Sequence, residues 1–280
     1  MVPVLLSAPA PMHKPTLSSI PRAFVVCLSL GAIPFHDLRA ATAALPRTAD
    51  GKPNLQGIWK ANTRAAYDLE SHDARLGVPA GRGVVLGGAI PYQPWAAAKR
   101  SEHLAGRETL DPLARCYLPG VPRIMYMDFP FHIFQTPRQI TMLFEWSQVF
   151  RLIYTDGSRP PDGISFWMGD SRGGWEGDTL VVSVTNHNDK TWFDMAGNFH
   201  SDAMRVTERY TMLDADSIRY EASIDDPQVF TRPWTIGVPL VRDKDLDRVL
   251  EYQCNAEAEE LSGAFPREPR TWYVKPGGRP

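Results

Sequence analysis

The densest group of side chains able to carry chemistry lies between His187 and Glu208. This segment holds two histidines, four carboxylates, a lysine and an arginine. A histidine beside a carboxylate is the arrangement that general acid–base catalysis needs, because the carboxylate fixes the imidazole tautomer and raises its basicity. The pair predicted first is His200 with Asp194 or Asp189, and His187 is the second choice of base.

Two other interpretations of this segment stay open. Asn188-Asp189 and Gly197-Asn198 are turn-forming pairs, so the carboxylates could cap turns while His200 packs at the start of a strand. A metal site would use imidazole and carboxylate ligands, but their spacing matches no signature such as H-E-x-x-H. The ligands concerned would be His187, Asp189, His200 and Asp202. We therefore predict no metal. The turn-forming pairs and the polar composition predict that the segment is a loop across one end of a β-barrel.

A second set of polar side chains, which comprises Tyr126, His132, Glu145 and Arg151, lies on the earlier strands. A Glu145–Arg151 pair inside a barrel would orient a polar group of a ligand. The alternative is a surface ion pair of little energetic value. Trp167 and Trp192 lie close to polar loop residues, so they are predicted to line the mouth of a ligand pocket, with core packing as the alternative.

Alternating apolar and polar residues indicate the elements that must position these groups. A period of two predicts β-strands. Runs of this kind, or of β-branched apolar residues, cover residues 131–133, 140–146, 150–154, 179–184, 204–210, 218–224, 234–241 and 249–254. We predict a mainly β protein: an antiparallel barrel of about eight strands with room for one small ligand. A loop-rich extension and one short helix, over residues 94–108, precede most of the barrel.

The N-terminus has the layout of a secretory signal peptide. Lys14 and Arg22 precede an apolar run over residues 23–35, and Ala41-Thr42-Ala43 offers a cleavage site before Ala44. The predicted signal is therefore residues 1–43, with Met12 a possible true start and a buried helix as the alternative. Residues 44–122 and the main barrel, residues 123–280, are predicted to form a single domain. The mature chain is expected to lack a membrane span.

The predicted export also determines which cysteines remain in the mature protein and whether they can form a disulfide. Cleavage would remove Cys27 and leave Cys116 and Cys254. In an oxidising compartment an even count predicts a disulfide, although two separately buried thiols are the alternative. The predicted location is the periplasm or the outside of the cell.

Composition and missing motifs exclude several functions. The formal net charge is -2, which argues against nucleic-acid binding. The chain contains no G-x-G-x-x-G or P-loop motif. We therefore predict no cofactor. The oligomeric state stays open.

Several longer motifs, in order along the chain, resemble those of a large bacterial family of exported proteins of unknown function. They include residues 119–123, 154–157, 175–182, 188–192 and 200–202. Gly57-Ile58-Trp59 is also similar to the start of lipocalin-like (calycin) barrels. The resemblance implies an exported β-rich domain. The chain departs from it at His187, where such proteins usually have Phe, and at Gln148 and Asp170.

These observations lead to a first hypothesis of a cofactor-independent lyase or isomerase. It would act on a small aromatic or apolar molecule, such as a plant-derived aromatic, by histidine–aspartate proton transfer. The second hypothesis is a lipocalin-like protein that only binds a small hydrophobic ligand. A metal-dependent hydrolase is the third. The partner in the first two is a small molecule.

Overall fold

The computed structural model describes residues 44–262 of the 280-residue chain. These residues belong to one compact unit. The predicted signal peptide, residues 1–43, and Met12 lie outside the described residues. Within residues 44–262, no helix is long and apolar enough to cross a membrane.

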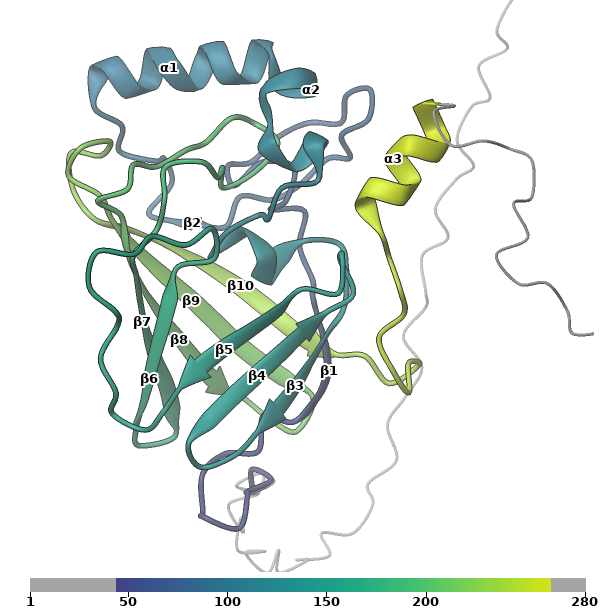
Figure 1. The fold of residues 1–280 in the computed structure, drawn as a ribbon, viewed down its shortest axis with the longest axis vertical. Helices are drawn as coiled ribbons and strands as arrows, with labels where there is room; N and C mark the ends of the chain where they lie inside the picture. The colour runs from purple at the N-terminus through teal and green to yellow at the C-terminus, as the bar shows by residue number, and fades with distance from the viewer. Residues whose placement is uncertain (1–43, 263–280) are drawn as a thin grey trace, which may run out of the picture. The chain divides into compact units, whose positions relative to one another are not determined.

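A closed β-barrel dominates the structure (Figure 1). Nine strands follow one another around it, and β1 closes the barrel by pairing with β10. They are β1 (Gly57–Ala61), β3 (Phe131–Gln135), β4 (Gln139–Phe144), β5 (Phe150–Tyr154), β6 (Asp170–Glu176), β7 (Thr179–Thr185), β8 (Arg205–Met212), β9 (Ser217–Asp225) and β10 (Trp234–Arg242). The two-residue strand β2 (Val85–Leu86) adds to β10 outside the ring. The prediction of a β-barrel is therefore confirmed.

Two details of the predicted barrel are wrong. The number of barrel strands is nine rather than eight, and the sheet is mixed rather than antiparallel, because β5 and β6 run parallel with Ile153 opposite Ser171. The chain crosses between these strands through residues 155–169, which return it to the same end of the barrel. Strand β6 was missed because its sequence, DSRGGWE, lacks apolar alternation.

The helical content also differs from the prediction. The expected helix over residues 94–108 is present as α1 (Pro94–Ala105) followed by α2 (Arg107–Leu110), and Pro94 occupies the first turn. The expectation of a single helix is wrong, because α3 (Cys254–Ser262) follows the barrel. The strand predicted over residues 249–254 is also wrong, since Tyr252 forms an isolated bridge with Trp146, rather than part of a strand, before α3 begins. Two 3₁₀ helices, η1 (Pro112–Arg115) and η2 (Arg123–Tyr126), complete the set.

The predicted period of two corresponds to the inside and outside of the barrel. On β4, Met142 and Phe144 are fully buried while Leu143 between them is half-buried. On β8, the buried residues Val206, Glu208 and Tyr210 alternate with more exposed ones. One glutamate therefore occupies a core position in the barrel.

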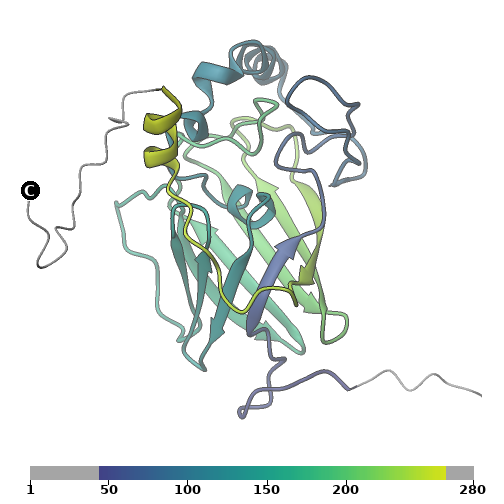
Figure 2. The ribbon, with the colours of Figure 1, turned by 90° about the vertical axis from the view of Figure 1, so that its right-hand side faces the viewer.

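Cys116 and Cys254 form the predicted disulfide. It joins the end of η1 to the first residue of α3, across a sequence separation of 138 residues. Helices α1 and α2 lie at the end of the barrel where β7 ends and β8 begins (Figures 1 and 2). The polar segment between those two strands lies at this end as well.

Candidate functional site

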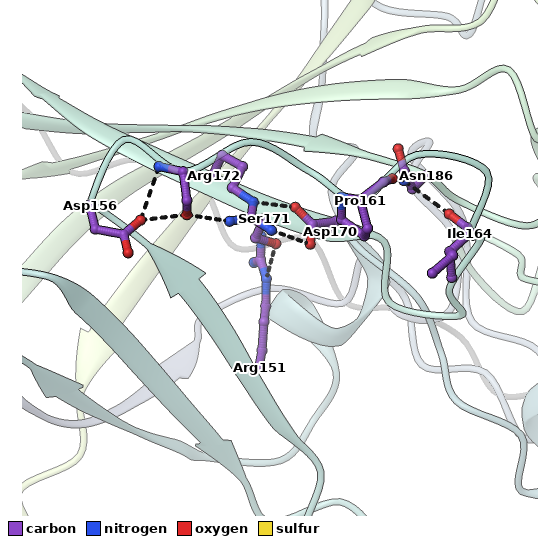
Figure 3. Close-up of polar contacts among 9 residues, drawn as sticks. Arg151, Asp156, Pro161, Ile164, Asp170, Ser171, Arg172 and Asn186 are labelled. Carbon is purple, nitrogen blue, oxygen red and sulfur yellow. Dashed lines mark hydrogen bonds and ion pairs between the residues drawn. The ribbon is translucent and has the colours of Figure 1, made fainter.

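His187 lies just beyond the end of β7, where the chain leaves the barrel wall. The preceding residue, Asn186, has a left-handed backbone (φ 58°), a conformation that asparagine tolerates better than most residues. The Asn186 side chain donates hydrogen bonds to the carbonyl oxygens of Pro161 and Ile164, at 2.7 and 2.9 Å (Figure 3). Phe166 forms a parallel bridge with His187. The 155–169 crossover is thereby fixed against the residues that follow β7.

The imidazole of His187 is buried, at 2% exposure, and neither ring nitrogen has a hydrogen-bond partner among the described residues. Burial lowers the pKa of His187 to about 3, and the nearby His200 and Arg151 lower it further, against a small opposing effect of the Val184 carbonyl. The ring is therefore neutral at neutral pH. It offers one donor and one acceptor, and apart from the weak effect of the Val184 carbonyl the described residues use neither.

His200 is close to His187, with ring centroids 5.8 Å apart, but its surroundings differ. Its Nδ1 lies 2.8 Å from the Ser201 carbonyl oxygen, and its Nε2 lies 2.7 Å from Thr191 Oγ1. A carbonyl only accepts, so Nδ1 carries the proton and Nε2 accepts from the threonine hydroxyl. Burial lowers the pKa of His200, while Ser201 and nearby aspartates oppose the shift. Both nitrogens of this histidine are engaged by the protein.

The structure does not join His200 to a carboxylate in a catalytic pair. Asp194 is fully buried, and its carboxylate accepts hydrogen bonds from the backbone amides of Leu69, Ala196 and Asn198 and from the Asn198 side chain. Burial, followed by the effect of Asp68, raises the pKa of Asp194 to about 7. These bonds anchor the loop, as the turn-capping alternative expected. Asp189, the other predicted partner, is exposed.

The predicted polar loop across the end of the barrel is far more buried than its polar sequence indicates. Thr191 to Asp194 and Ala196 to His200 are all buried. Trp192 is 6% exposed and stacks on His103 of α1, with ring centroids 4.5 Å apart. This segment is therefore a packed cap of the barrel end.

The barrel interior holds a buried ion pair between Arg151 of β5 and Glu208 of β8. Arg151 Nη1 lies 3.0 Å from Glu208 Oε1, and its Nε and Nη2 donate to Ser171 Oγ (Figure 3). Tyr210 and Tyr220 donate to Glu208 Oε1 at 3.0 and 2.8 Å. Burial opposes the charge on Arg151, yet Glu208 outweighs it and raises the pKa of Arg151. The network is complete, which is the condition for an ion pair to be tolerated in a core.

The predicted Glu145–Arg151 pair is wrong. Glu145 follows β4 on the opposite face from Phe144, and its Oε2 accepts from the backbone amide of Leu250. His132 is half-buried on β3 and stacks on Phe134, with centroids 4.0 Å apart. Tyr126 is fully buried in η2 and donates to the Phe193 carbonyl at 2.9 Å. Of this second set, only Arg151 acts electrostatically on the His187 ring.

A pocket of about 550 Å³ opens between the crossover and the residues after β7. We call it the His187 pocket. Its lining includes Ile164, Trp167, His187, Asp189, Lys190 and Asp202. The predicted site residues His187, Asp189 and Trp167 therefore line one pocket. The other predicted site residues do not line it: Asp194, His200, Trp192, Tyr126, His132, Glu145 and Arg151.

Sequence reasoning missed the central role of Glu208. The available signal was its position on the apolar face of an alternating strand, between Val206 and Tyr210. No sequence signal pairs it with Arg151, because the two residues lie 57 positions apart and meet only through barrel closure. The contribution of Lys190 to the pocket wall was also missed.

No three or more His, Cys, Asp or Glu side chains in the described part of the chain cluster closely enough to hold a metal ion. Comparisons with protein-family profiles and with curated protein sequences find no match for this chain. The function is therefore argued from the geometry of the site.

Proposed function

We propose that this protein is exported and binds a small, flat, largely apolar molecule in the His187 pocket, on a lipocalin-like barrel. The observation that carries the proposal is the buried imidazole of His187 with two unpartnered nitrogens. An unsatisfied buried polar atom costs about 1–3 kcal/mol, so a native protein that keeps one needs a reason. A ligand hydroxyl, which both donates and accepts, matches a neutral imidazole.

The pocket walls support an aromatic or otherwise flat ligand. The lining of the pocket is mainly polar, and Trp167 and Ile164 supply its apolar part beside His187. Pockets for small molecules commonly combine apolar walls with a few polar groups that fix the orientation. Both nitrogens of His187 are covered by neighbouring atoms, so a ligand that bonds to them requires the pocket wall to move. The Cys116–Cys254 disulfide fits an oxidising compartment, either the periplasm or the outside of the cell.

The experiment that tests this proposal is calorimetric titration with 2-naphthol, a flat apolar probe with one hydroxyl group. Wild type should bind it, and His187→Phe should raise Kd about fivefold to tenfold, because phenylalanine keeps the ring but loses the hydrogen bond. His132→Phe is the matched control, since His132 lies on β3 and does not line the pocket. Equal affinities for wild type and His187→Phe would refute the role of His187.

The second candidate is the cofactor-independent lyase or isomerase. It is favoured by the second histidine beside His187, whose ring centroid lies 5.8 Å away. A general base works best with a pKa near the operating pH, and a pKa of about 3 is far below it. Catalysis would therefore need the ligand to raise the basicity of His187. Exchange of ligand C–H protons in D₂O, followed by NMR in wild type and His187→Phe, separates binding from proton transfer.

A further inference from the structure

A second pocket, of about 500 Å³, shares Trp167 and Lys190 with the His187 pocket. We call it the Tyr117 pocket. Its remaining walls come from α2, η1 and the residues directly after η1. They include Leu110, Pro112, Arg115 and Tyr117. Because two of its residues also line the His187 pocket, the two pockets are neighbours.

The charges of the Tyr117 pocket all have one sign. Arg115 and Lys190 are its ionisable cations, and no carboxylate lines it. Among the side chains that the structure describes, neither cation makes an ion pair. Exposed arginine and lysine side chains that converge on one hollow attract an anionic group.

The same pocket has an aromatic wall. Tyr117 and Trp167 stack nearly parallel, with ring centroids 5.0 Å apart and an interplanar angle of 10°. Lys190 Nζ lies 5.9 Å from the centroid of the Trp167 ring. The pocket therefore places positive charge beside a flat apolar surface, the combination that suits an aromatic anion.

We propose that the ligand is an elongated aromatic carboxylate whose anionic end lies between Arg115 and Lys190 and whose hydroxyl end faces His187. This inference rests on the proposed function, since it uses the His187 pocket for the second end. Asp189 and Asp202 line that pocket and outnumber its one cation, Lys190, which both pockets share, so a carboxylate is disfavoured there. The asymmetry of charge between the two pockets thus sets the orientation of the ligand.

Three rigid probes test the proposal by isothermal titration calorimetry: 6-hydroxy-2-naphthoate, its uncharged carboxamide and 2-naphthoate. Wild type should bind 6-hydroxy-2-naphthoate about tenfold more tightly than the carboxamide. Arg115→Gln should remove most of that preference and leave the affinity for the carboxamide unchanged. Arg75→Gln is the matched control, because Arg75 is an exposed arginine that lines neither pocket. Lys190→Gln repeats the test from a different segment if Arg115→Gln does not fold.

The outcomes separate this inference from the proposed function. Equal binding of carboxylate and carboxamide by wild type overturns the anion site, while a loss of affinity for both hydroxyl probes in His187→Phe would still support the proposed function. If 2-naphthoate binding depends on Arg115 but no hydroxyl probe depends on His187, the two-ended orientation and the proposed function both fail. Absence of binding for all three probes overturns the inference.

Discussion

Replacement of His187 by phenylalanine should change how the stability of the protein depends on pH. Wild type keeps a buried neutral imidazole with a pKa of about 3, whereas an exposed histidine in the unfolded chain has a pKa of about 6.5. The unfolded state therefore binds the proton more tightly than the folded state. A depressed histidine pKa contributes stability that is present above pH 6.5 and is lost as the pH falls toward 3.

The size of the effect follows from the two pKa values. The full shift of about 3.5 pKa units corresponds to about 5 kcal/mol, at about 1.4 kcal/mol for each unit. Most of this loss occurs between pH 6.5 and pH 3. Between pH 7.5 and pH 5, His187 should lower the free energy of unfolding by about 2 kcal/mol. His187→Phe removes this term, because phenylalanine does not titrate.

The assay is urea unfolding followed by tryptophan fluorescence at pH 7.5 and pH 5.0, for wild type and His187→Phe. The free energy of unfolding of wild type should fall by about 2 kcal/mol more than that of the variant over this interval. The comparison cancels other groups, such as Asp194, whose raised pKa acts in the opposite direction. His132→Phe serves as control. Equal losses in wild type and His187→Phe would show that burial does not hold His187 neutral.

Three further predictions concern the stability of the barrel and of the loops around the site. Glu208→Gln should lower the free energy of unfolding by about 3–5 kcal/mol, because it leaves the buried Arg151 charge unpaired. The double variant Arg151→Met/Glu208→Leu should lose less free energy of unfolding, because it removes both charges. Urea unfolding measures both variants, and a larger loss in the double variant would contradict this prediction. Replacing Cys116 and Cys254 by serine should cost about 4–5 kcal/mol for so long a loop, seen as a lower Tm, and an unchanged Tm would count against it. Gly120→Ala should destabilise more than its matched control Gly157→Ala: both glycines have φ near +76°, but only at Gly120 would a new Cβ lie 2.5 Å from Thr191 Oγ1. Equal losses at the two glycines would show that Thr191 moves aside freely.

Most of the barrel could be predicted from the sequence because its strands alternate. Runs such as Val206, Glu208 and Tyr210 carry a period of two that also gives the buried face. Strand β6 has two adjacent glycines, Gly173 and Gly174, and no such pattern. Its parallel pairing with β5 depends on the path of the 155–169 crossover, for which the local sequence offers no rule.

The candidate site was predictable in composition but not in pairing. His187, Asp189 and Trp167 were singled out because polar and aromatic residues cluster near the end of a strand. Pairing His200 with Asp194 failed because sequence proximity does not reveal that backbone amides already use the carboxylate. The partner of Arg151 was equally hidden, since barrel closure rather than chain proximity brings Glu208 to it.

The buried Arg151–Glu208 ion pair influences the charge state of His187. Glu208 and its two tyrosines hold Arg151 in the barrel, and the charge of Arg151 in turn helps to keep the pKa of His187 low. A well-packed apolar core could give similar stability, so stability alone does not explain a charged pair in this position. The charge of Arg151 adds to burial in favouring the uncharged ring of His187, which can both donate to and accept from a ligand hydroxyl at neutral pH.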